Sequence, residues 1–477
     1  MTAAVVSDAL GFVERSIAKK RTIRRHAPWA SIKWTEMRMP EFDFFVTEPP
    51  LDYKDVFNPM WHLLMSFGGQ KEERFDFDAR TSFQDLTEYI RSNSEIRERF
   101  FWSDEHDTLF STSVMLFVEY LVDRYIHVVG ETRFNPEQFL PVYLPLEAGL
   151  ILESLPIEIV VPIVQVALES DEYEISEGIA VFRMPEPLQL ARAIRAHDTH
   201  EVNEYILQQA SHSFALRDYV LPNNRGTQFP SYAAETFPLD IIDAFFAALR
   251  IVTSIETGYA QLLVVPTEWA HSYTAALIPL GGTTIRRYPP NLNPVSALYG
   301  TDFPQVSDAQ LASVRELFAG INAIQNSRNE RGSRLRLAIK RLNSCFLREN
   351  EEDAILDATI GMEVLLSDGG AQEVTHKLAL RLAALSSLVP KYRQQATSVL
   401  RNVKSFIYPY RSAVVHGRES NASKKREIKT ETGGAIPAVK LATEYLGMAI
   451  QAVASNPEFL DPSLIDEKLL LGRTAHS

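Results

Sequence analysis

The chain has 477 residues and a formal net charge of −13; apolar residue types make up 45% of it and charged types 23%. This composition is that of an ordinary globular protein with about two to four domains, and it argues against a general nucleic-acid coat protein. The single cysteine, Cys345, excludes an internal disulfide and fits the reducing cytoplasm, where we expect the protein to reside.

Neither a secretory signal nor a membrane span is expected from the sequence. Residues 1–18 carry Asp8 and Glu14 and have no long apolar core. The most apolar stretch, residues 148–168, is interrupted by Glu153 and by prolines, so it lacks the ~20 continuous apolar residues of a membrane helix. We therefore expect no membrane among the partners.

Residues 1–235 are predicted to form a mixed α/β (α+β) region. Alternating apolar residues over 29–48 favour one or two strands, and from 82 to 129 the apolar period becomes helical. The stretch 140–235 reads as mixed and mostly helical, with prolines at intervals.

Residues 236–300 are predicted to close that region with a helix, a β-hairpin and a linker. The helix covers the apolar run 239–252, and strands are expected over 258–288. Gly281-Gly282 has the composition of a two-residue hairpin turn. The proline-rich stretch 289–294 is typical of a linker.

An all-α bundle is predicted for residues 305–455, followed by a C-terminal tail over 456–477. Ser307-Asp308 can cap the first helix, and a longer polar loop is expected over 418–434. The six helices expected are 308–325, 333–348, 351–366, 372–388, 392–407 and 436–454.

Charge is distributed unevenly along the chain. Residues 305–455 contain 21 Lys and Arg against 15 Asp and Glu, a balance of +6, so the other residues sum to −19. A polyanion would therefore dock on the bundle. The acidic remainder could shield the bundle until a trigger arrives.

One short segment of the bundle carries the residues for a chemical step. Arg411 and His416 are separated by four residues, Ser412 to Val415, and Gly417 follows. An arginine forks onto phosphate oxygens, and a histidine transfers a proton near neutral pH. At the end of a helix, the dipole favours the imidazolium form of His416 by about 0.3–1 kcal/mol.

Positions five apart on a straight helix point about 140° away from each other. Arg411 and His416 can therefore meet at one phosphate only through their long side chains, through a kink at Pro409, or across the axis of a dimer.

Three segments in this order resemble the Apea-type HEPN family of bacterial phage-defence proteins: residues 354–366 (AILDATIGMEVLL), 374–385 (VTHKLALRLAAL) and 410–417 (YRSAVVHG). The resemblance extends over residues 305–455. It implies an all-α HEPN-like helical bundle that acts as a metal-independent endoribonuclease in a dimer or higher homo-oligomer. It also implies a sensor or regulatory N-terminal region, and growth arrest or abortive infection as the outcome.

The resemblance also implies roles for individual residues. Arg411 would hold the scissile phosphate and His416 would be the general acid/base, while Ser412 and Glu363 would orient them. The 2′-OH would attack the adjacent phosphate and give a 2′,3′-cyclic phosphate. The expected partners are RNA, with tRNA as one candidate, and a phage-derived trigger; no cofactor is expected.

Basic residues after the histidine are well placed to grip an RNA backbone, although a mobile solvated loop would have the same composition. They are Arg418, Lys424, Lys425, Arg426 and Lys429.

Other interpretations remain open for the same residues. Arg411 and His416 could form only a helix cap and a surface ion pair, and Glu363 a structural ion pair. The bundle could be a catalytically inactive scaffold that binds RNA or protein, or the toxin of a HEPN/nucleotidyltransferase pair.

No metal site is expected from local spacing. His197 and His200, and the acidic run 104–107, could ligate a metal, but a solvated helix surface and an acidic helix start explain them better.

Overall fold

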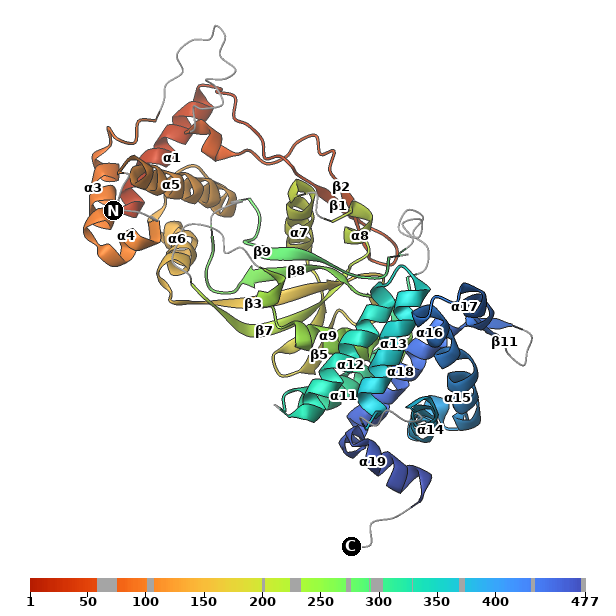
Figure 1. Cartoon of the computed structure of the whole chain (residues 1–477). Coiled ribbons are helices and arrows are strands. Elements are labelled where there is room, and N and C mark those ends of the chain that lie inside the picture. Colours follow the sequence, from red (N-terminus) through yellow and green to blue (C-terminus); the bar gives the residue numbers. More distant parts are fainter. Residues whose placement is uncertain are drawn as a thin grey trace. The chain divides into compact units, whose positions relative to one another are not determined.

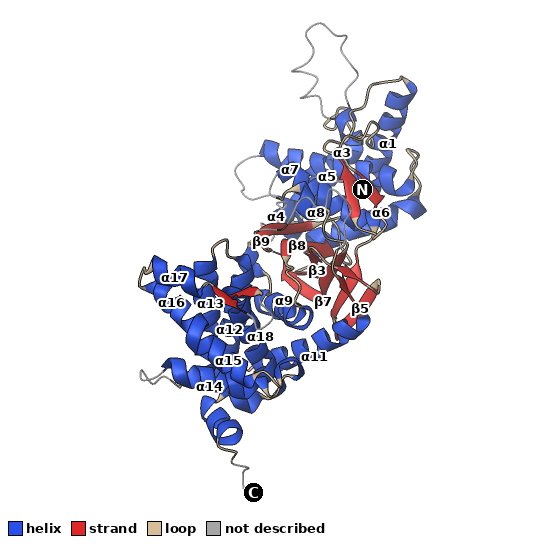
Figure 2. Ribbon diagram, turned by 90° about the vertical axis from the view of Figure 1, so that its right-hand side faces the viewer, coloured by secondary structure: helices blue, strands red, loops and turns tan. Residues whose placement is uncertain are grey.

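The computed structural model describes residues 1–57, 75–100, 107–199, 202–223, 233–271, 276–290, 292, 303–327, 329–368, 374–429 and 434–472. The chain is mixed α/β, as expected, with many helices and one six-stranded sheet in the order β5-β6-β7-β3-β8-β9 (Figures 1 and 2).

Two compact units make up the chain, and each is assembled from separate segments. Unit 1 comprises Met1–Pro162, Arg183–Ala233 and Gln261–Ile285. Unit 2 comprises Ile163–Phe182, Ala234–Ala260 and Arg286–Ser477. Each domain predicted from the sequence is one continuous stretch of chain, because sequence patterns do not reveal which distant segments pack together.

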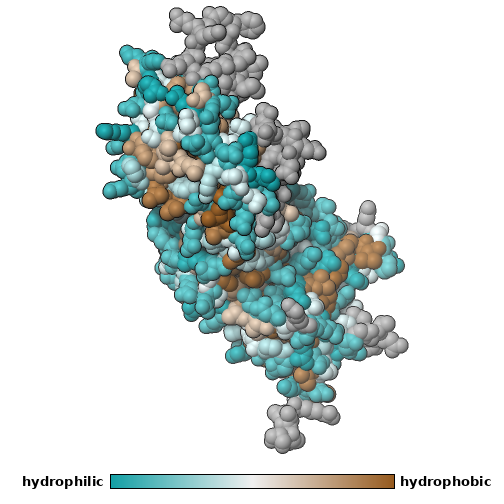
Figure 3. Space-filling model, turned by 90° about the vertical axis from the view of Figure 1, so that its left-hand side faces the viewer, coloured by the Kyte–Doolittle hydropathy of each residue, from teal (hydrophilic) through white to brown (hydrophobic). Residues whose placement is uncertain are grey.

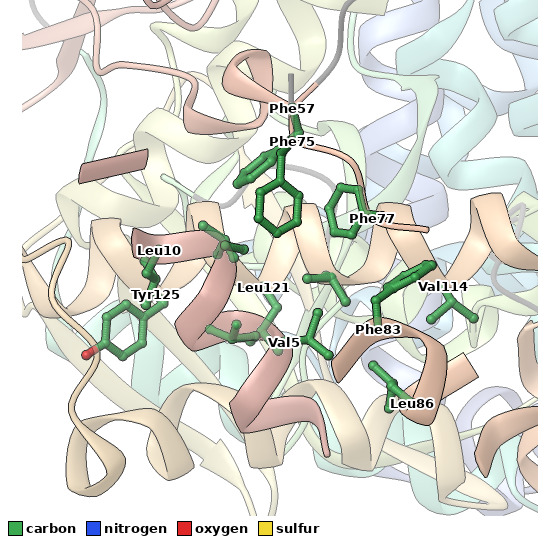
Figure 4. Close-up of a cluster of buried hydrophobic side chains, with 14 of the residues drawn as sticks. Val5, Leu10, Phe57, Phe75, Phe77, Phe83, Leu86, Val114, Leu121 and Tyr125 are labelled. Carbon is green, nitrogen blue, oxygen red and sulfur yellow. The ribbon is translucent and has the colours of Figure 1, made fainter. Parts of the chain in front are cut away.

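The helices of unit 1 enclose a hydrophobic cluster (Figure 4). On α5 (Asp107–Val129) the apolar face predicted from the period is buried, including Val114, Leu121 and Tyr125. Val5 and Leu10 of α1 pack against it, and the cluster also takes in four phenylalanines that the figure labels: Phe57, Phe75, Phe77 and Phe83. The other helices are α1 (Thr2–Ala18), η1 (Tyr53–Val56), α3 (Thr81–Ser92), α4 (Ser94–Phe100), α6 (Pro136–Ile151), α7 (Glu186–Thr199), α8 (Glu204–Leu207) and η2 (Ala234–Thr236), the last of which belongs to unit 2.

Strands were predicted correctly near the N-terminus and missed further on. β1 (Ser31–Trp34) and β2 (Pro40–Asp43) pair antiparallel, which confirms the strands expected over 29–48. The stretch 140–235 was expected to be mostly helical, and this is wrong, because it supplies much of the sheet. The last five residues of β3 (Ser154–Ile163) are all buried, so this part is a continuous apolar run that periodicity does not separate from a helix. The other strands are β4 (Ala167–Leu168), β5 (Glu172–Ser176), β6 (Ile179–Arg183), β7 (His212–Pro222), β8 (Tyr259–Pro266), β9 (Gly281–Arg287) and β10 (Gln305–Val306).

Gly281 and Gly282 are the first two residues of β9, so the predicted hairpin turn at this position is wrong. Gly282 has φ +128°, and a Cβ atom there would lie 2.2 Å from the carbonyl oxygen of Leu262 in β8. The glycine is needed for the close approach of the two strands. Residues 272–275, and residues 291, 293 and 294 of the expected linker, lie outside the described part of the chain.

Unit 2 is mainly helical, and most of its helices begin and end near the predicted residues. Ser307 and Gln310 form a capping box at the start of α11 (Asp308–Gln325), as the cap prediction requires. α13 (Glu351–Leu366) packs against α12 (Glu330–Leu347) and α18 (Ala438–Ser455). The remaining helices are α9 (Leu239–Thr253), α14 (Val374–Ser386), η3 (Pro390–Tyr392), α15 (Ala396–Asn402), η4 (Val403–Ile407) and α16 (Tyr408–Val415). Cys345 is buried in α12, as expected for a core residue.

Two predictions for the end of the chain need correction. The expected polar loop contains a helix, α17 (Glu419–Lys425), and a strand, β11 (Glu427–Lys429), which pairs with β12 (Ala435–Pro437) just after the loop. The expected tail contains η5 (Pro457–Leu460), α19 (Pro462–Leu464) and η6 (Ile465–Leu470), and its Asp466 accepts two hydrogen bonds from Arg381 of α14. Buried Phe459 and Ile465 show that these turns belong to the packed unit.

The surface is mostly hydrophilic on the face drawn in Figure 3, with separate hydrophobic patches. Within the described ranges, no helix has the length and apolar character needed to cross a membrane.

Candidate active site

The segment that carries Arg411 is helical from Ala396 to Val415, with a π-helical stretch, η4, just before α16. Pro409 lies in the first turn of α16 and has no N–H to donate to the carbonyl of Ser405. That carbonyl accepts a hydrogen bond from Lys425 Nζ at 3.0 Å instead. The proline is therefore accommodated by a change of helix type just before it.

A Schellman motif ends α16. The N–H of Arg418 donates to Ala413 O at 2.8 Å, and the N–H of Gly417 donates to Val414 O at 3.1 Å. Gly417 has φ +62°, the left-handed conformation in which many helices end. His416 is thus the C-cap residue, and its side chain is exposed.

Arg411 and Ser412 border an open cavity of about 620 Å³. One helical face of η4 and α16 supplies Lys404 and Tyr408 to the same wall. The other lining residues come from the end of α13 and the start of α14, with Pro409: they are Glu363, Ser367 and Thr375.

Glu363 anchors this wall through one carboxylate oxygen. Tyr408 donates its hydroxyl to Glu363 Oε1 at 3.0 Å, and Arg411 Nη2 lies 3.6 Å from the same atom. Burial, and then the negative charge of Glu363, raise the pKa of Tyr408, so the phenol stays protonated and remains a donor. Arg411 Nε is buried and has no hydrogen-bond partner among the described residues. The ion pair with Glu363 therefore orients the guanidinium at the cavity wall.

His416 does not line this cavity. It follows Arg411 by five residues at the end of the same helix, so the two side chains leave the helix about 140° apart. One copy of the chain brings together Arg411, Ser412 and Glu363, but it does not add the imidazole to them.

The five basic residues after the histidine divide into two groups. Lys425 is held by Ser405 O and lies 5.0 Å from the centre of the Phe406 ring, and Arg426 bonds to Glu351. Arg418, Lys424 and Lys429 are exposed. Of the five, these three present their charge to solvent without a contact like those of Lys425 and Arg426. The basic surface therefore contains fewer free cationic side chains than the composition predicts.

Lys404 and Tyr408 were missed by the reasoning from sequence. They precede Arg411 by seven and three residues, a spacing that places all three on one helical face, so a signal was present. Ser367 and Thr375 had no such signal, because their approach depends on how α13 and α14 pack.

The metal candidates with local spacing do not form a site in the described residues. His197 Nδ1 lies 3.1 Å from Glu204 Oε1, and its ring stacks on Phe44 with 4.1 Å between centres. His197 thus takes part in an ion pair and a ring contact near the surface. Residues 104–106, 200 and 201 lie outside the described part of the chain.

Comparison with known proteins gives no relative for this chain. No family model matches it, and neither does any curated protein or solved structure. The geometry of the site therefore has to carry the functional argument.

Proposed function

We propose that the chain is a metal-independent endoribonuclease of the HEPN type that cleaves RNA in bacterial phage defence, with growth arrest as the outcome. The observation that carries the proposal is the oriented guanidinium of Arg411 beside Lys404 and Ser412 in an open cavity. Two cations and a hydroxyl form a fitting cradle for a phosphodiester.

The proposed reaction uses groups from two copies of the chain. The 2′-oxygen attacks the adjacent phosphorus, the bond to the 5′-oxygen breaks, and a 2′,3′-cyclic phosphate and a 5′-hydroxyl result. Arg411 stabilises the charge on the phosphorane. A two-fold pair would supply two His416 side chains, one to take the 2′-proton and one to protonate the 5′-oxygen.

The test of this chemistry is cleavage of a short RNA beside the same RNA carrying one 2′-deoxynucleotide at the mapped cleavage position. We expect the first to be cut in EDTA to a cyclic-phosphate end and the second to remain intact at that position. Cleavage of the deoxy-substituted position would contradict attack by the 2′-oxygen.

A second candidate is a HEPN-like scaffold that binds RNA without cutting it. The position of His416 outside the cavity favours this alternative, because binding needs only the cationic wall. It predicts RNA binding that depends on Arg411 and Lys404, with no turnover and no effect of His416→Ala. Modification of the protein by a nucleotidyltransferase partner would instead favour the interpretation that the chain is the toxin of a HEPN/nucleotidyltransferase pair.

A further inference from the structure

We propose that His26, Asp123 and His127 of unit 1 form a binding site for a divalent transition-metal ion, with Zn²⁺ as the fitting member of the class. Each of the three residues offers one ligand atom, and these atoms lie within 4.8 Å of one another. The site belongs to the other unit from Arg411, and the proposal does not depend on the nuclease function.

Two different elements bring the ligands together. Asp123 and His127 are one turn apart on α5, so both project from the same helical face. His26 follows α1 in a connecting segment held by backbone hydrogen bonds, from its own N–H to Pro50 O at 2.9 Å and from Asp52 N–H to Arg24 O at 2.8 Å. The ligands are therefore positioned before any ion binds, which limits the ordering cost of binding.

Burial makes the cluster unusual. His26 is 8% exposed and Asp123 is fully buried. His26 Nε2 and Asp123 Oδ2 lie 3.7 Å apart, and neither has a hydrogen-bond partner among the described residues. Buried polar atoms without partners are costly. One metal ion between them would satisfy both atoms.

The other contacts of Asp123 and His127 show which hydrogen bonds metal binding would keep and which it would replace. Asp123 Oδ1 accepts the N–H of Tyr53 at 2.9 Å, so this oxygen is already satisfied and Oδ2 faces the ion. His127 Nε2 lies 3.4 Å from Asp123 Oδ1 and 3.0 Å from Leu51 O. Ligation through Nε2 would replace the contact with Leu51 and leave the ring proton on Nδ1.

Lys54 is the cation that competes for this position. Its Nζ lies 3.9 Å from Asp123 Oδ2 and 3.8 Å from Asp52 Oδ1. A bound ion would repel the ammonium toward Asp52, which keeps it paired. Removal of the Lys54 charge should therefore strengthen metal binding, whereas a purely structural ion-pair network gives no reason for such a gain.

The ligand types select the metal. Two imidazoles and one carboxylate suit zinc and its neighbours, while Mg²⁺ prefers oxygen ligands throughout. Three protein ligands leave a coordination position open. A cavity of about 460 Å³ borders His26, Asp52 and Lys54 on one side of the cluster, whereas Asp123 and His127 do not line it.

The experiment is a Zn²⁺ titration of untagged full-length protein after EDTA dialysis, monitored by competition with a chromophoric chelator. We expect one tight site per chain and none for Mg²⁺. His26→Ala and His127→Ala should each weaken Zn²⁺ binding at least about tenfold, and Lys54→Gln should strengthen it. His197→Ala, which changes a partly exposed histidine outside the cluster, is the matched control and should leave the affinity unchanged.

Circular dichroism checks that the variants fold. If His26→Ala does not fold, the milder His26→Asn replaces it in the titration. A thermal shift gives a second readout, because Zn²⁺ should raise the unfolding temperature of wild type and not of the folded ligand variants. Absence of a one-to-one site, or equal binding by wild type and both histidine variants, would overturn the proposal. The ribonuclease assay in EDTA does not measure metal binding. A negative result in the Zn²⁺ titration therefore does not contradict the proposed ribonuclease, and a negative ribonuclease assay does not contradict the metal site.

Discussion

Single residues decide how the candidate site is built. Glu363 interrupts an apolar helix, and the resemblance noted in the sequence implies that it orients Arg411 or His416. The structure places it beside Arg411 and leaves His416 outside the cavity. The pairing of Glu363 with Tyr408 could not be foreseen, because it depends on the packing of α13 against α16.

Residue-level electrostatics also leads to a pH prediction in unit 1. Burial raises the pKa of Glu119 on α5 from 4.5 to about 8, so the native carboxyl stays protonated near neutral pH. Between these values the unfolded chain loses the proton and the native chain keeps it. The contribution of Glu119 to stability is therefore complete below pH 4.5 and falls as pH rises, by up to about 1.4 kcal/mol per pH unit.

Glu119→Gln should remove this dependence, because the amide does not ionise. Urea unfolding from pH 5 to 8 should show the variant gaining stability relative to wild type at each higher pH. A difference that stays constant over this range would contradict the raised pKa.

At the scale of elements, caps and apolar periods predicted most helices well, because both signals are local. The capping box at Ser307 and the period of α5 are examples. The polar segment after His416 was taken as a loop, since α17 has no apolar stripe and is only seven residues long. Among the strands between residues 154 and 222, β3 was missed because its second half is a continuously buried run that lacks alternation.

The end of α16 depends on Gly417, whose left-handed φ is strained for other residues. A Cβ atom there would meet nothing within 4 Å, so a substitution would carry only the backbone cost. We expect Gly417→Ala to lower the free energy of unfolding by about 1–2 kcal/mol. Gly417→Asn, which tolerates this conformation better, should cost less. Equal stability of the alanine variant and wild type in urea unfolding would contradict the role of the Schellman motif.

For the whole molecule, the main surprise is that unit 2 includes α9, which precedes the predicted bundle by more than fifty residues. Phe245 and Phe246 of α9 are fully buried. Arg250 donates to Asn343 of α12 at 2.6 Å, and Asn343 donates to Asp243 O at 2.9 Å. Sequence periodicity identified α9 as an apolar helix but could not identify its packing partners.

A fragment of residues 305–477 should therefore fail to fold as an independent domain. It lacks α9 and exposes the apolar surfaces of α11 and α12 that α9 covers. We expect broad thermal unfolding and strong binding of a hydrophobic dye, compared with full-length protein. Sharp cooperative unfolding of the fragment would show that the bundle is autonomous.

The proposed nuclease depends on Arg411 of one copy acting with His416 of another, and one assay addresses this directly. Cleavage of total RNA in EDTA is measured for wild type, Arg411→Ala, His416→Ala, and the two variants mixed under conditions that exchange subunits. Arg401→Ala, on the same helical segment, and His376→Ala, on α14, are controls at exposed positions. We predict cleavage by wild type and both controls, loss of at least about a hundredfold in each site variant, and partial recovery in the mixture. Equal cleavage by wild type and both site variants would contradict the account.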